Sequence, residues 1–305
     1  MTARWSIDEP FYIHDTSERT LVGDVLYPFA YDELMCRRVG EGAAPLVHVW
    51  RHEKALVLGL RDRRLPMAEL GMSWLSSQGY QVGVRSSGGA AVPLDPGVIN
   101  ISLILPVGEG KPDFRAGFAE MRDLIAETLQ RFGVDIQTGE VKGSYCPGDF
   151  DLSIDGRKFC GISQRRQNKA YAVQAFVVVE GHAERRAQMV RMFYEMATGE
   201  ENNERDGWLE PQDGAAAAVG VEPDSEREAE ESSRGALLSY PIIRPGTMGS
   251  LVSLAGGKGI TMRTFTLALR QTLQQRGGRL ERHSALPSMD ELQRKAAELK
   301  QRYGG

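Results

Sequence analysis

The strongest structural signal in this chain is the segment Ser144-Tyr-Cys-Pro-Gly-Asp-Phe-Asp-Leu-Ser-Ile-Asp-Gly-Arg-Lys-Phe-Cys-Gly-Ile-Ser-Gln-Arg-Arg166. Apolar and polar residues alternate over 150–154, a pattern typical of a half-buried strand. Asp155 and Gly156 follow, and this pair between two strand-like runs predicts a two-residue hairpin turn. The second strand would then return over 157–163. The segment therefore predicts antiparallel β-structure in the middle of the chain.

The same segment carries a candidate nucleophile. Cys146 precedes Pro147 and Gly148, so we expect it on a turn, where a side chain is accessible. Lys158 lies on the returning strand, and the hairpin makes a contact with Cys146 possible without proving it. A nearby ammonium would lower the pKa of a cysteine from about 8.5 towards neutrality and can stabilise negative charge on an acyl oxygen. The alternative interpretation is a buried structural cysteine and a solvated lysine.

Composition sets broad limits on the class of protein. At 305 residues the chain is long enough for one large domain or two small ones. A hydrophobic content of 41% and a charged content of 26% are ordinary for a soluble globular protein. The net charge of -4 argues against nucleic acid as the main partner. Three cysteines, an odd and low count, do not support a disulfide framework and favour a reducing compartment.

Targeting signals are not evident in the sequence. The N-terminal residues lack the apolar run of a signal peptide, and no stretch approaches the roughly 18 apolar residues of a membrane span. We therefore expect a cytoplasmic protein without a membrane partner.

A second notable segment covers 82–105. Gly88 and Gly89 lie between two strand-like runs and allow the backbone to approach a ligand closely. Arg85, just before them, can hold a carboxylate, phosphate or carbonyl group. Asn100 lies on the polar face of the strand that ends the segment, and it would need hydrogen-bond partners if it were buried. Taken alone, such a stretch is more often a corner of a sheet tightened by glycine.

The sequence lacks the common motifs for a nucleotide or a metal. The glycine spacing fits neither G-x-G-x-x-G nor G-x-x-x-x-G-K-[ST], so this segment does not indicate a nucleotide. The histidines and cysteines do not have zinc-type spacing. We therefore expect no cofactor and no metal.

The remaining elements follow from periodicity and end signals. Helices are predicted at 29–39, 66–78, 114–132, 183–196, 261–275 and 288–303. Strands are predicted at 46–50 and 55–60, which we expect to form a hairpin, and at 99–105 and 171–179, the last of them central because it is almost continuously apolar. Residues 61–64 are expected to form a charged loop. Ser288 and Glu291 have the spacing of a capping box at the last helix.

Together, the two notable segments resemble the lipoate and octanoate transferases and ligases of the biotin/lipoate-ligase fold. The stretch Arg85-Ser-Ser-Gly-Gly-Ala-Ala-Val-Pro-Leu-Asp-Pro-Gly-Val-Ile-Asn-Ile-Ser matches their acyl-binding glycine motif. The stretch from Cys146 to Arg166 looks most like that of the octanoyl-[GcvH]:protein N-octanoyltransferases. Phe29-Ala-Tyr-Asp-Glu and Val57-Leu-Gly-Leu-Arg-Asp-Arg-Arg-Leu-Pro also fit this subgroup. The resemblance covers about residues 25–200.

The resemblance implies a fold and a domain organisation. The fold would be of the α/β (α+β) class, with a mostly antiparallel sheet and packed helices. Residues 1–24 would form an N-terminal arm and 25–198 the catalytic domain. Residues 199–235, rich in Glu, Asp, Gly and Ala, would form an acidic flexible insert, which the family does not lead us to expect. Residues 236–305 would be a C-terminal helical segment packed on the catalytic domain.

The resemblance also implies roles for individual residues. Cys146 would carry the octanoyl group as a thioester, and Lys158 would lower the pKa of Cys146 and bind the acyl carbonyl. The expected substrate-binding residues are Arg85, Gly88, Gly89, Asn100 and Gly161. ATP-dependent ligases carry a histidine in the loop occupied here by Pro93-Leu-Asp95, and its loss argues against adenylation.

The implied activity is acyl transfer without a cofactor. The donor would be an octanoyl-lysine on the glycine-cleavage H protein, and the acceptor a lysine on the lipoyl domain of a 2-oxoacid dehydrogenase E2 subunit. An octanoyltransferase that takes its acyl group from acyl carrier protein remains an alternative, because surface complementarity decides the choice of donor. A non-catalytic protein that binds acyl groups is a second alternative.

Overall fold

The computed structural model describes residues 10–108, 115–199, 240–280 and 286–304. The strands are β1 (Phe11–Asp15), β2 (Leu46–Trp50), β3 (Ala55–Leu58), β4 (Gln81–Val84), β5 (Val92–Leu94), β6 (Val98–Pro106), β7 (Gln137–Thr138), β8 (Leu152–Ile154), β9 (Arg157–Arg166), β10 (Ala170–Val178) and β11 (Gly278–Arg279). The helices are α1 (Leu26–Gly40), α2 (Leu60–Arg63), α3 (Ala68–Ser77), α4 (Ala116–Gln130), α5 (Ala183–Thr198), α7 (Leu251–Leu254), α8 (Met262–Gln275) and α9 (Met289–Tyr303).

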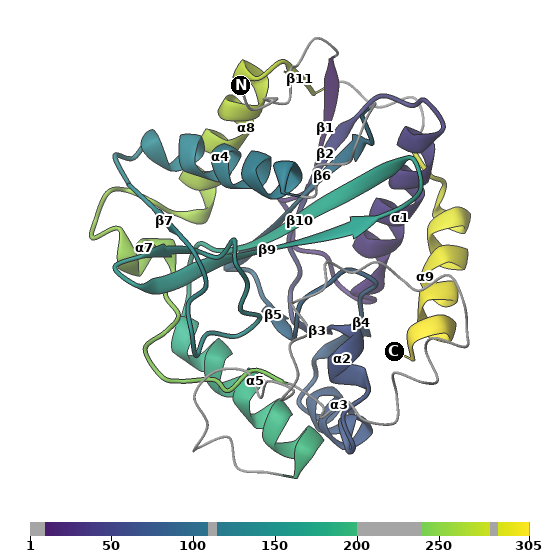
Figure 1. The fold of residues 1–305 in the computed structure, drawn as a ribbon, viewed down its shortest axis with the longest axis vertical. Helices are drawn as coiled ribbons and strands as arrows, with labels where there is room; N and C mark the ends of the chain where they lie inside the picture. The colour runs from purple at the N-terminus through teal and green to yellow at the C-terminus, as the bar shows by residue number, and fades with distance from the viewer. Residues whose placement is uncertain (1–9, 109–114, 200–239, 281–285, 305) are drawn as a thin grey trace.

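Two sheets form the centre of the molecule (Figure 1). The larger sheet has eight strands in the order β11-β1-β2-β6-β10-β9-β8-β7, and the smaller has the order β4-β3-β5. Only the pairs β1–β2, β1–β11 and β3–β4 are parallel among the described strands. The predicted α/β class with a mostly antiparallel sheet is therefore confirmed. The long strands β6 and β10 pair antiparallel in the middle of the large sheet, which confirms the predicted central strand.

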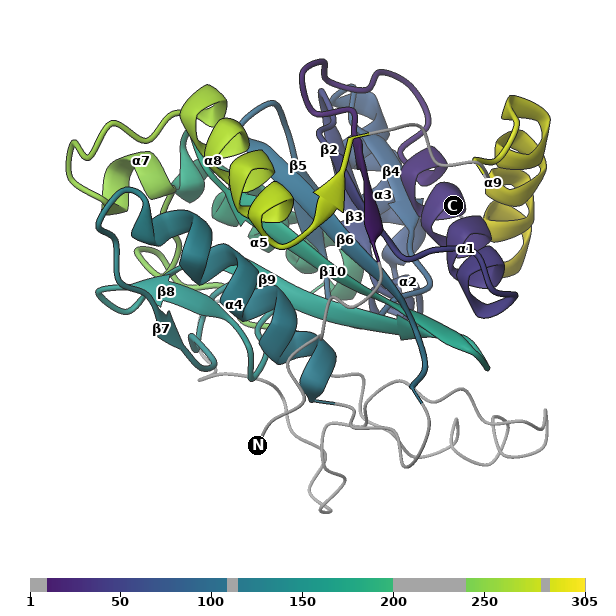
Figure 2. The same cartoon turned by 90° about the horizontal axis from the view of Figure 1, so that it is seen from above.

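The two faces of the large sheet are covered differently (Figure 2). Helices α4 and α8 cover one face, and their apolar side chains share a core with Ile99, Ile101, Leu103 and Leu105 of β6. Those four residues alternate along β6 as the sequence predicts. Helices α1 and α5 and the small sheet lie on the other face, where a second core includes Cys146 and Phe176. The candidate nucleophile therefore lies between the two sheets.

The predicted hairpin of 46–50 and 55–60 is wrong. β2 pairs with β1 and β6 in the large sheet, whereas β3 pairs with β4 and β5 in the small sheet. Every residue of both strands is buried. Each strand therefore contributes to the centre of its own sheet. The chain therefore crosses from one sheet to the other between these strands.

The predicted hairpin after Ile154 is confirmed. β8 and β9 pair antiparallel, and the turn residues Asp155 and Gly156 have φ angles of 49° and 71°. Two consecutive positive φ angles are typical of the tight turn that an Asp-Gly pair favours. This turn sets the direction of β9, the strand that carries Lys158 and Gly161.

Each predicted helix overlaps a helix of the structure. The charged loop predicted at 61–64 is wrong, because Leu60–Arg63 form the short helix α2. The carboxylate of Asp62 accepts a hydrogen bond from the Gly59 N–H at 2.7 Å and so closes this turn. At α9, Ser288 and Glu291 form the predicted capping box.

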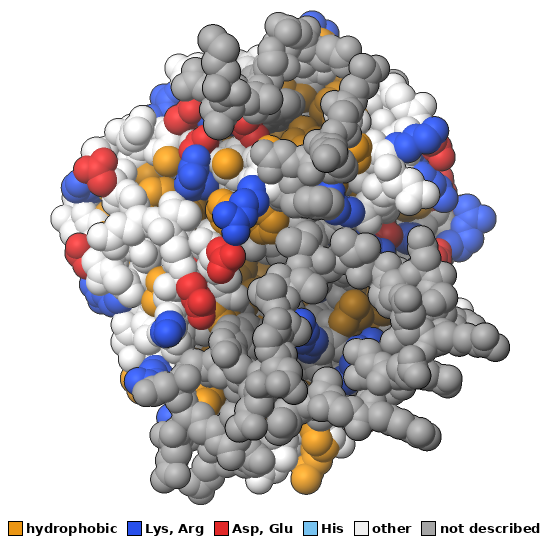
Figure 3. Space-filling view, viewed as in Figure 1, with side chains coloured by type: hydrophobic (Ala, Val, Ile, Leu, Met, Phe, Trp, Pro, Cys, Tyr) orange, Lys and Arg blue, Asp and Glu red, His pale blue; other side chains and the backbone are white. Residues whose placement is uncertain are grey.

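The described part of the C-terminal segment packs on both sides of the molecule. Helix α8 lies against α4, and α9 lies against α1 (Figure 2). The predicted acidic insert at 199–235 lies almost entirely outside the described residues. None of the described helices is both long and apolar enough to span a membrane. On the face shown in Figure 3, basic and acidic side chains are interspersed among the described residues.

Candidate active site

Cys146 lies in a bend before β8, as the sequence predicts, but its side chain is only 8% exposed. The expected accessibility is therefore wrong, because the loop after β4 lies against the thiol. The Ala90 N–H donates to the Sγ atom at 3.3 Å, and Nη2 of Arg85 donates to it at 3.6 Å. A backbone amide and a guanidinium thus both face the sulfur, an arrangement that can stabilise negative charge there.

The backbone of Cys146 has an unusual conformation. Its φ angle is 47°, and Asp155 is the only other non-glycine residue with a positive φ in the described ranges. Asp155 is explained by its hairpin turn, whereas Cys146 is not part of a hairpin. Left-handed φ angles cost energy for residues with a β-carbon and persist only where surrounding contacts enforce them. Lys158 makes such contacts with the carbonyls of Tyr145 and Cys146.

Lys158 is fully buried beneath Cys146. Its Nζ atom donates to the carbonyl of Tyr145 at 2.9 Å and to the carbonyl of Cys146, and it pairs with Oδ1 of Asp151 at 2.8 Å. An ammonium has three donors, so these acceptors occupy all of them. Binding an acyl carbonyl would require Lys158 to release one of these partners. Its predicted roles in lowering the pKa of Cys146 and holding the substrate stay predictions.

Asp151 is a site residue that sequence reasoning missed. Burial raises its pKa to about 6, although the ammonium of Lys158 and the N–H groups of Gly148 and Val141 favour the charged form. The two N–H groups donate to Oδ2 at 3.2 and 3.4 Å. Asp151 thus ties the loop before β8 to Lys158. The alternation pattern placed Asp151 on the polar face of a strand, and only the fold shows that this face is covered.

Arg85 is 5% exposed and forms the opposite wall of the thiol site. Its guanidinium donates to the carbonyls of Val57, Gly88 and Ala90, the last at 2.7 Å. These bonds curl the loop after β4 around the side chain and bring the Ala90 N–H to the sulfur. Arg85 thus lies against the backbone of Gly88 and beside the Cys146 sulfur, while its predicted role in binding substrate stays a prediction.

Gly89 is sterically required at this site. Its φ angle is 94°, and a β-carbon there would lie 2.8 Å from both Nη2 of Arg85 and Sγ of Cys146. Gly88 differs, because a β-carbon on it would meet no atom within 4 Å. Gly161, on β9, lets the ring of Phe176 pack against the strand, since a β-carbon would approach that ring to 2.5 Å. Gly161 thus helps to shape a pocket beside the thiol.

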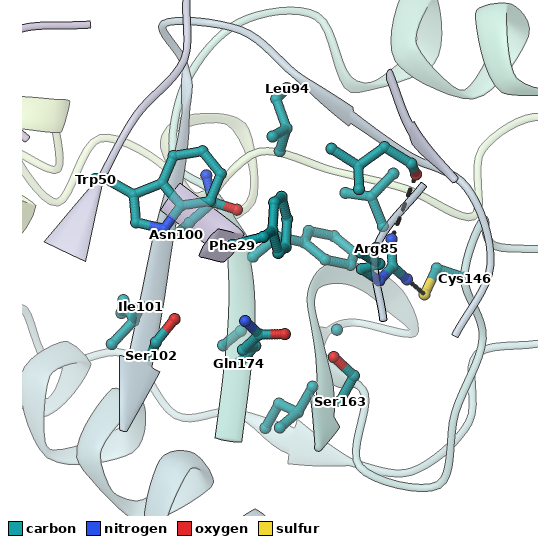
Figure 4. Close-up of a pocket in the computed structure, with 16 residues that line it drawn as sticks. Phe29, Trp50, Arg85, Leu94, Asn100, Ile101, Ser102, Cys146, Ser163 and Gln174 are labelled. Atoms are coloured by element: carbon teal, nitrogen blue, oxygen red, sulfur yellow. Dashed lines mark hydrogen bonds between the residues drawn. The ribbon is translucent and has the colours of Figure 1, made fainter. Parts of the chain in front are cut away.

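An apolar pocket extends from Cys146 between the two sheets. Its lining residues are Phe29, Trp50, Val57, Arg85, Val92, Leu94, Asn100, Ile101, Ser102, Cys146, Gly161, Ile162, Ser163, Gln174, Ala175 and Phe176. Figure 4 shows Cys146 and Arg85 on one side of this pocket and Trp50 and Asn100 on the opposite side. The predicted site residues Arg85, Asn100, Cys146 and Gly161 therefore line one cavity, suited to an apolar chain attached at the sulfur.

The side of the pocket remote from Cys146 carries polar atoms. Among the described residues, Trp50 Nε1, Asn100 Nδ2 and Gln174 Oε1 are buried without a hydrogen-bond partner. Gln174 Nε2 and the Ser102 hydroxyl donate to Oδ2 of Asp32 at 2.7 and 2.5 Å. Asn100 is thus buried, and its amide nitrogen has no acceptor among the described residues, although a buried amide was expected to need one. Trp50 lies on β2 and Gln174 on β10, and sequence reasoning identified neither as a residue of the site.

Comparison with known proteins identifies the class to which this fold and site belong. Residues 24–207 match the family described as the lipoyl protein ligase A/B catalytic domain, which is more than half of the chain. The chain belongs to this family. Two solved structures have the same fold. Lipoate-protein ligase A bound with ATP has a TM-score of 0.61 and 15% sequence identity, and the match covers 95% of this chain and 94% of that chain. A bi-partite lipoate protein ligase from Thermoplasma acidophilum has a TM-score of 0.58 and 17% identity, and the match covers 95% of this chain and 91% of that chain.

Closer relatives are acyltransferases. The octanoyl-[GcvH]:protein N-octanoyltransferase of Anoxybacillus flavithermus is 39% identical over 87% of this chain and 84% of its own length. The enzyme of the same name from Geobacillus kaustophilus is 37% identical over 84% and 79%. The lipoyl-[GcvH]:protein N-lipoyltransferase of Listeria monocytogenes is 44% identical over 56% and 62%. These similarities confirm the predicted resemblance and support acyl transfer as the reaction class.

Proposed function

We propose that this protein moves an octanoyl group from an octanoyl-lysine of the glycine-cleavage H protein to a lysine of an E2 lipoyl domain, through a thioester on Cys146. The observation that carries the proposal is the contact of the Cys146 sulfur with Arg85 and the Ala90 N–H at one side of an apolar pocket. The names of the relatives in Anoxybacillus and Geobacillus support the same donor class.

The first half-reaction forms the thioester. The sulfur of Cys146 attacks the amide carbonyl carbon, a C–S bond forms, and the carbonyl oxygen takes negative charge. The C–N bond then breaks, and the lysine amine of the donor leaves with the proton that the thiol gave up. The Ala90 N–H and the Arg85 guanidinium are the donors placed to stabilise the charge on sulfur and on the nearby oxygen. In the second half-reaction the acceptor amine attacks the thioester carbonyl, a C–N bond forms and the C–S bond breaks. The proton that the amine loses goes to the departing sulfur, which restores the Cys146 thiol.

Energetics constrain this scheme. An amide is more stable than a thioester, so loading Cys146 is uphill, and the burial of the site protects the intermediate from water. The complete transfer converts one amide into another and is close to thermoneutral. We expect it to run in both directions. Transfer in a single direction with saturating acceptor would contradict the scheme.

Lys158 has a different task in this proposal from the one first expected. Its ammonium holds the carbonyls of Tyr145 and Cys146, and so maintains the positive φ of the nucleophile. Acyl-carbonyl binding would follow only if Lys158 exchanged one of these acceptors for the substrate. Acylation of a Lys158→Ala variant therefore measures how far transfer depends on this residue.

The test of the proposal is intact-mass spectrometry of the protein mixed with octanoylated H protein. We expect a mass increase of one octanoyl group on the wild type, loss of the adduct in Cys146→Ala, and its release by an apo lipoyl domain. An adduct formed from octanoyl-acyl-carrier-protein but not from H protein would favour the alternative donor. No adduct from either donor would favour a non-catalytic acyl-binding protein.

A second candidate acyl group is the lipoyl group. Trp50 Nε1 and Asn100 Nδ2 are donors without a partner among the described residues, on the pocket side remote from the thiol. Sulfur atoms near the end of an acyl chain are weak acceptors that can use such donors, and the Listeria relative is named for lipoyl transfer. Loading with lipoylated H protein at a rate similar to octanoylated H protein would support a protein that accepts both groups.

A further inference from the structure

We propose that Asp62 and Tyr194 are positioning residues that hold the loop 85–91 on the thiol of Cys146. The inference rests on the proposed function, because it concerns the same nucleophile. Neither residue touches the sulfur through a contact that the structure records. Both act on the two donors that do, the Ala90 N–H and the Arg85 guanidinium.

Asp62 and Tyr194 form a buried pair from distant elements. Asp62 is on α2 and Tyr194 on α5, and the Tyr194 hydroxyl donates to Oδ1 of Asp62 at 2.8 Å. The Tyr194 oxygen in turn accepts a hydrogen bond from the Ala91 N–H at 3.1 Å. Both side chains are removed from solvent, Asp62 at 2% exposed and Tyr194 at 0%. A short chain of hydrogen bonds thus runs from the carboxylate to the loop.

These hydrogen bonds end at Ala91, the residue next to the one that donates to the Cys146 sulfur. Ala91 follows Ala90, whose N–H donates to Sγ of Cys146 at 3.3 Å. Fixing the Ala91 peptide to the Tyr194 oxygen therefore restricts the direction of the preceding peptide groups, since successive peptide planes share a Cα atom. A shift of a few tenths of an ångström at Ala91 would lengthen the bond to sulfur.

Asp62 also holds the loop from its other side. Its Oδ2 atom accepts from the Gly59 N–H at 2.7 Å, and the backbone of Gly59 lies against Gly89. A β-carbon at Gly59 would approach the Gly89 carbonyl oxygen to 2.0 Å, which shows how close the two segments are. Gly89 and Ala91 flank Ala90. One carboxylate therefore supports both neighbours of the residue that donates to the thiol.

The charge of Asp62 matters to this arrangement. Burial raises its pKa to about 6, while the bonds from Gly59 and Tyr194 and the charges of Arg85 and Arg61 favour the ionised form. An ionised Asp62 accepts a hydrogen bond from the Tyr194 hydroxyl, and the tyrosine oxygen can then accept a hydrogen bond from the Ala91 N–H. Hydrogen bonds in such a chain strengthen each other in a low-dielectric interior.

A purely structural role for the pair makes a different prediction. Buried tyrosine–aspartate pairs often contribute only stability, and their loss then lowers the melting temperature without changing the chemistry of a distant thiol. A positioning role additionally changes how the Cys146 thiolate is stabilised. The pH dependence of Cys146 alkylation separates the two roles. A variant that is less stable but still melts well above the assay temperature keeps the wild-type profile unless the thiol site itself has changed.

The experiment compares the full-length wild type with Tyr194→Phe and Asp62→Asn. Iodoacetamide modification of Cys146 is followed by peptide mass spectrometry from about pH 5 to about pH 10, around the ordinary cysteine value of about 8.5. The control is Tyr31→Phe, since Tyr31 is also buried and its hydroxyl has no partner among the described residues. Circular dichroism and melting temperature verify that each variant is folded.

We expect both test variants to be alkylated about tenfold more slowly at neutral pH, with the midpoint of the profile shifted upward by about one unit. Tyr31→Phe should keep the wild-type profile. Unchanged profiles in folded Tyr194→Phe and Asp62→Asn would overturn the proposal and leave a structural role only. If Asp62→Asn does not fold, Tyr194→Phe, which removes a single oxygen, decides the outcome.

The alkylation readout uses no acyl substrate. Failure of octanoyl transfer from H protein would therefore count against the proposed function while leaving a shifted profile in Tyr194→Phe intact. An unshifted profile in an enzyme that transfers octanoyl groups would count against the positioning role alone.

Discussion

The ammonium of Lys158 donates to the main-chain carbonyl of Cys146, whereas the sulfur of Cys146 faces the guanidinium of Arg85. Two cations thus serve the same residue in different ways. Lys158 contacts the backbone of Cys146, which has a left-handed φ angle, and Arg85 faces the sulfur that we propose as the nucleophile.

Replacement of Arg85 should affect chemistry most. Arg85→Gln removes the positive charge at Sγ and weakens the bonds that curl the loop, so we expect thioester formation to slow by about 100-fold. Arg85→Lys keeps the charge but loses the planar fork, and it should be intermediate. Single-turnover mass spectrometry of the octanoyl adduct measures both rates. Arg263→Gln on the exposed side of α8 is the control; equal rates for Arg85→Gln and this control would exclude Arg85 from the reaction.

Replacement of Lys158 should affect stability as well as activity. Lys158→Met leaves the Asp151 carboxylate buried without its ion-pair partner, which typically costs about 3 to 5 kcal/mol. The double variant Lys158→Met with Asp151→Asn should recover part of that loss, because no unpaired charge remains. Urea unfolding of the wild type, both single variants and the double variant measures the coupling. Additive losses would show that the pair contributes no interaction energy.

The pH dependence of the free energy of unfolding should show the raised pKa of Asp62. Its folded pKa of about 6 lies above the ordinary value of 3.8, so between these values the folded protein binds more protons than the unfolded chain. This group's contribution to the free energy of unfolding is therefore largest at low pH and falls as pH rises through that window, by on the order of 2 to 3 kcal/mol. Asp62→Asn should reduce this slope in urea titrations at several pH values. A variant with the wild-type slope would show that the carboxyl titrates normally.

Gly89 should not tolerate a side chain. Gly89→Ala places a β-carbon 2.8 Å from Sγ of Cys146 at a φ angle of 94°, so we expect a large loss of acylation and a cost of about 1 kcal/mol or more in stability. Gly108→Ala is the matched control, because a β-carbon there meets no atom within 4 Å and its φ angle is not positive. Acylation by mass and melting temperature report the two effects. Wild-type acylation in Gly89→Ala would mean that the loop can move away from the thiol.

Several features could be predicted because their causes are local. The Asp155-Gly156 turn, the capping box of Ser288 and the alternation along β6 depend on residues within a few positions of each other. Backbone preference and side-chain periodicity act over this range, so the sequence alone determined the central hairpin and the last helix. The mostly antiparallel sheet was expected from the family resemblance. Cys146 and the Arg85 loop were found because their motifs are contiguous.

The contacts within the site and the pairing of the strands at 46–60 depended on which distant segments of the chain meet. Tyr194 and Asp62 are separated by 132 positions, and Arg85 and Cys146 by 61, yet hydrogen bonds join each pair. The hairpin predicted for 46–60 failed for the same reason, since the partners of a strand are chosen by burial across the whole molecule. Packing of distant segments likewise encloses Cys146 and places the Lys158 ammonium against the Cys146 carbonyl. The sequence therefore identified Cys146, Lys158 and Arg85 as candidate site residues. The tertiary structure decided that Arg85 rather than Lys158 contacts the sulfur, because that depends on packing between elements far apart in the chain.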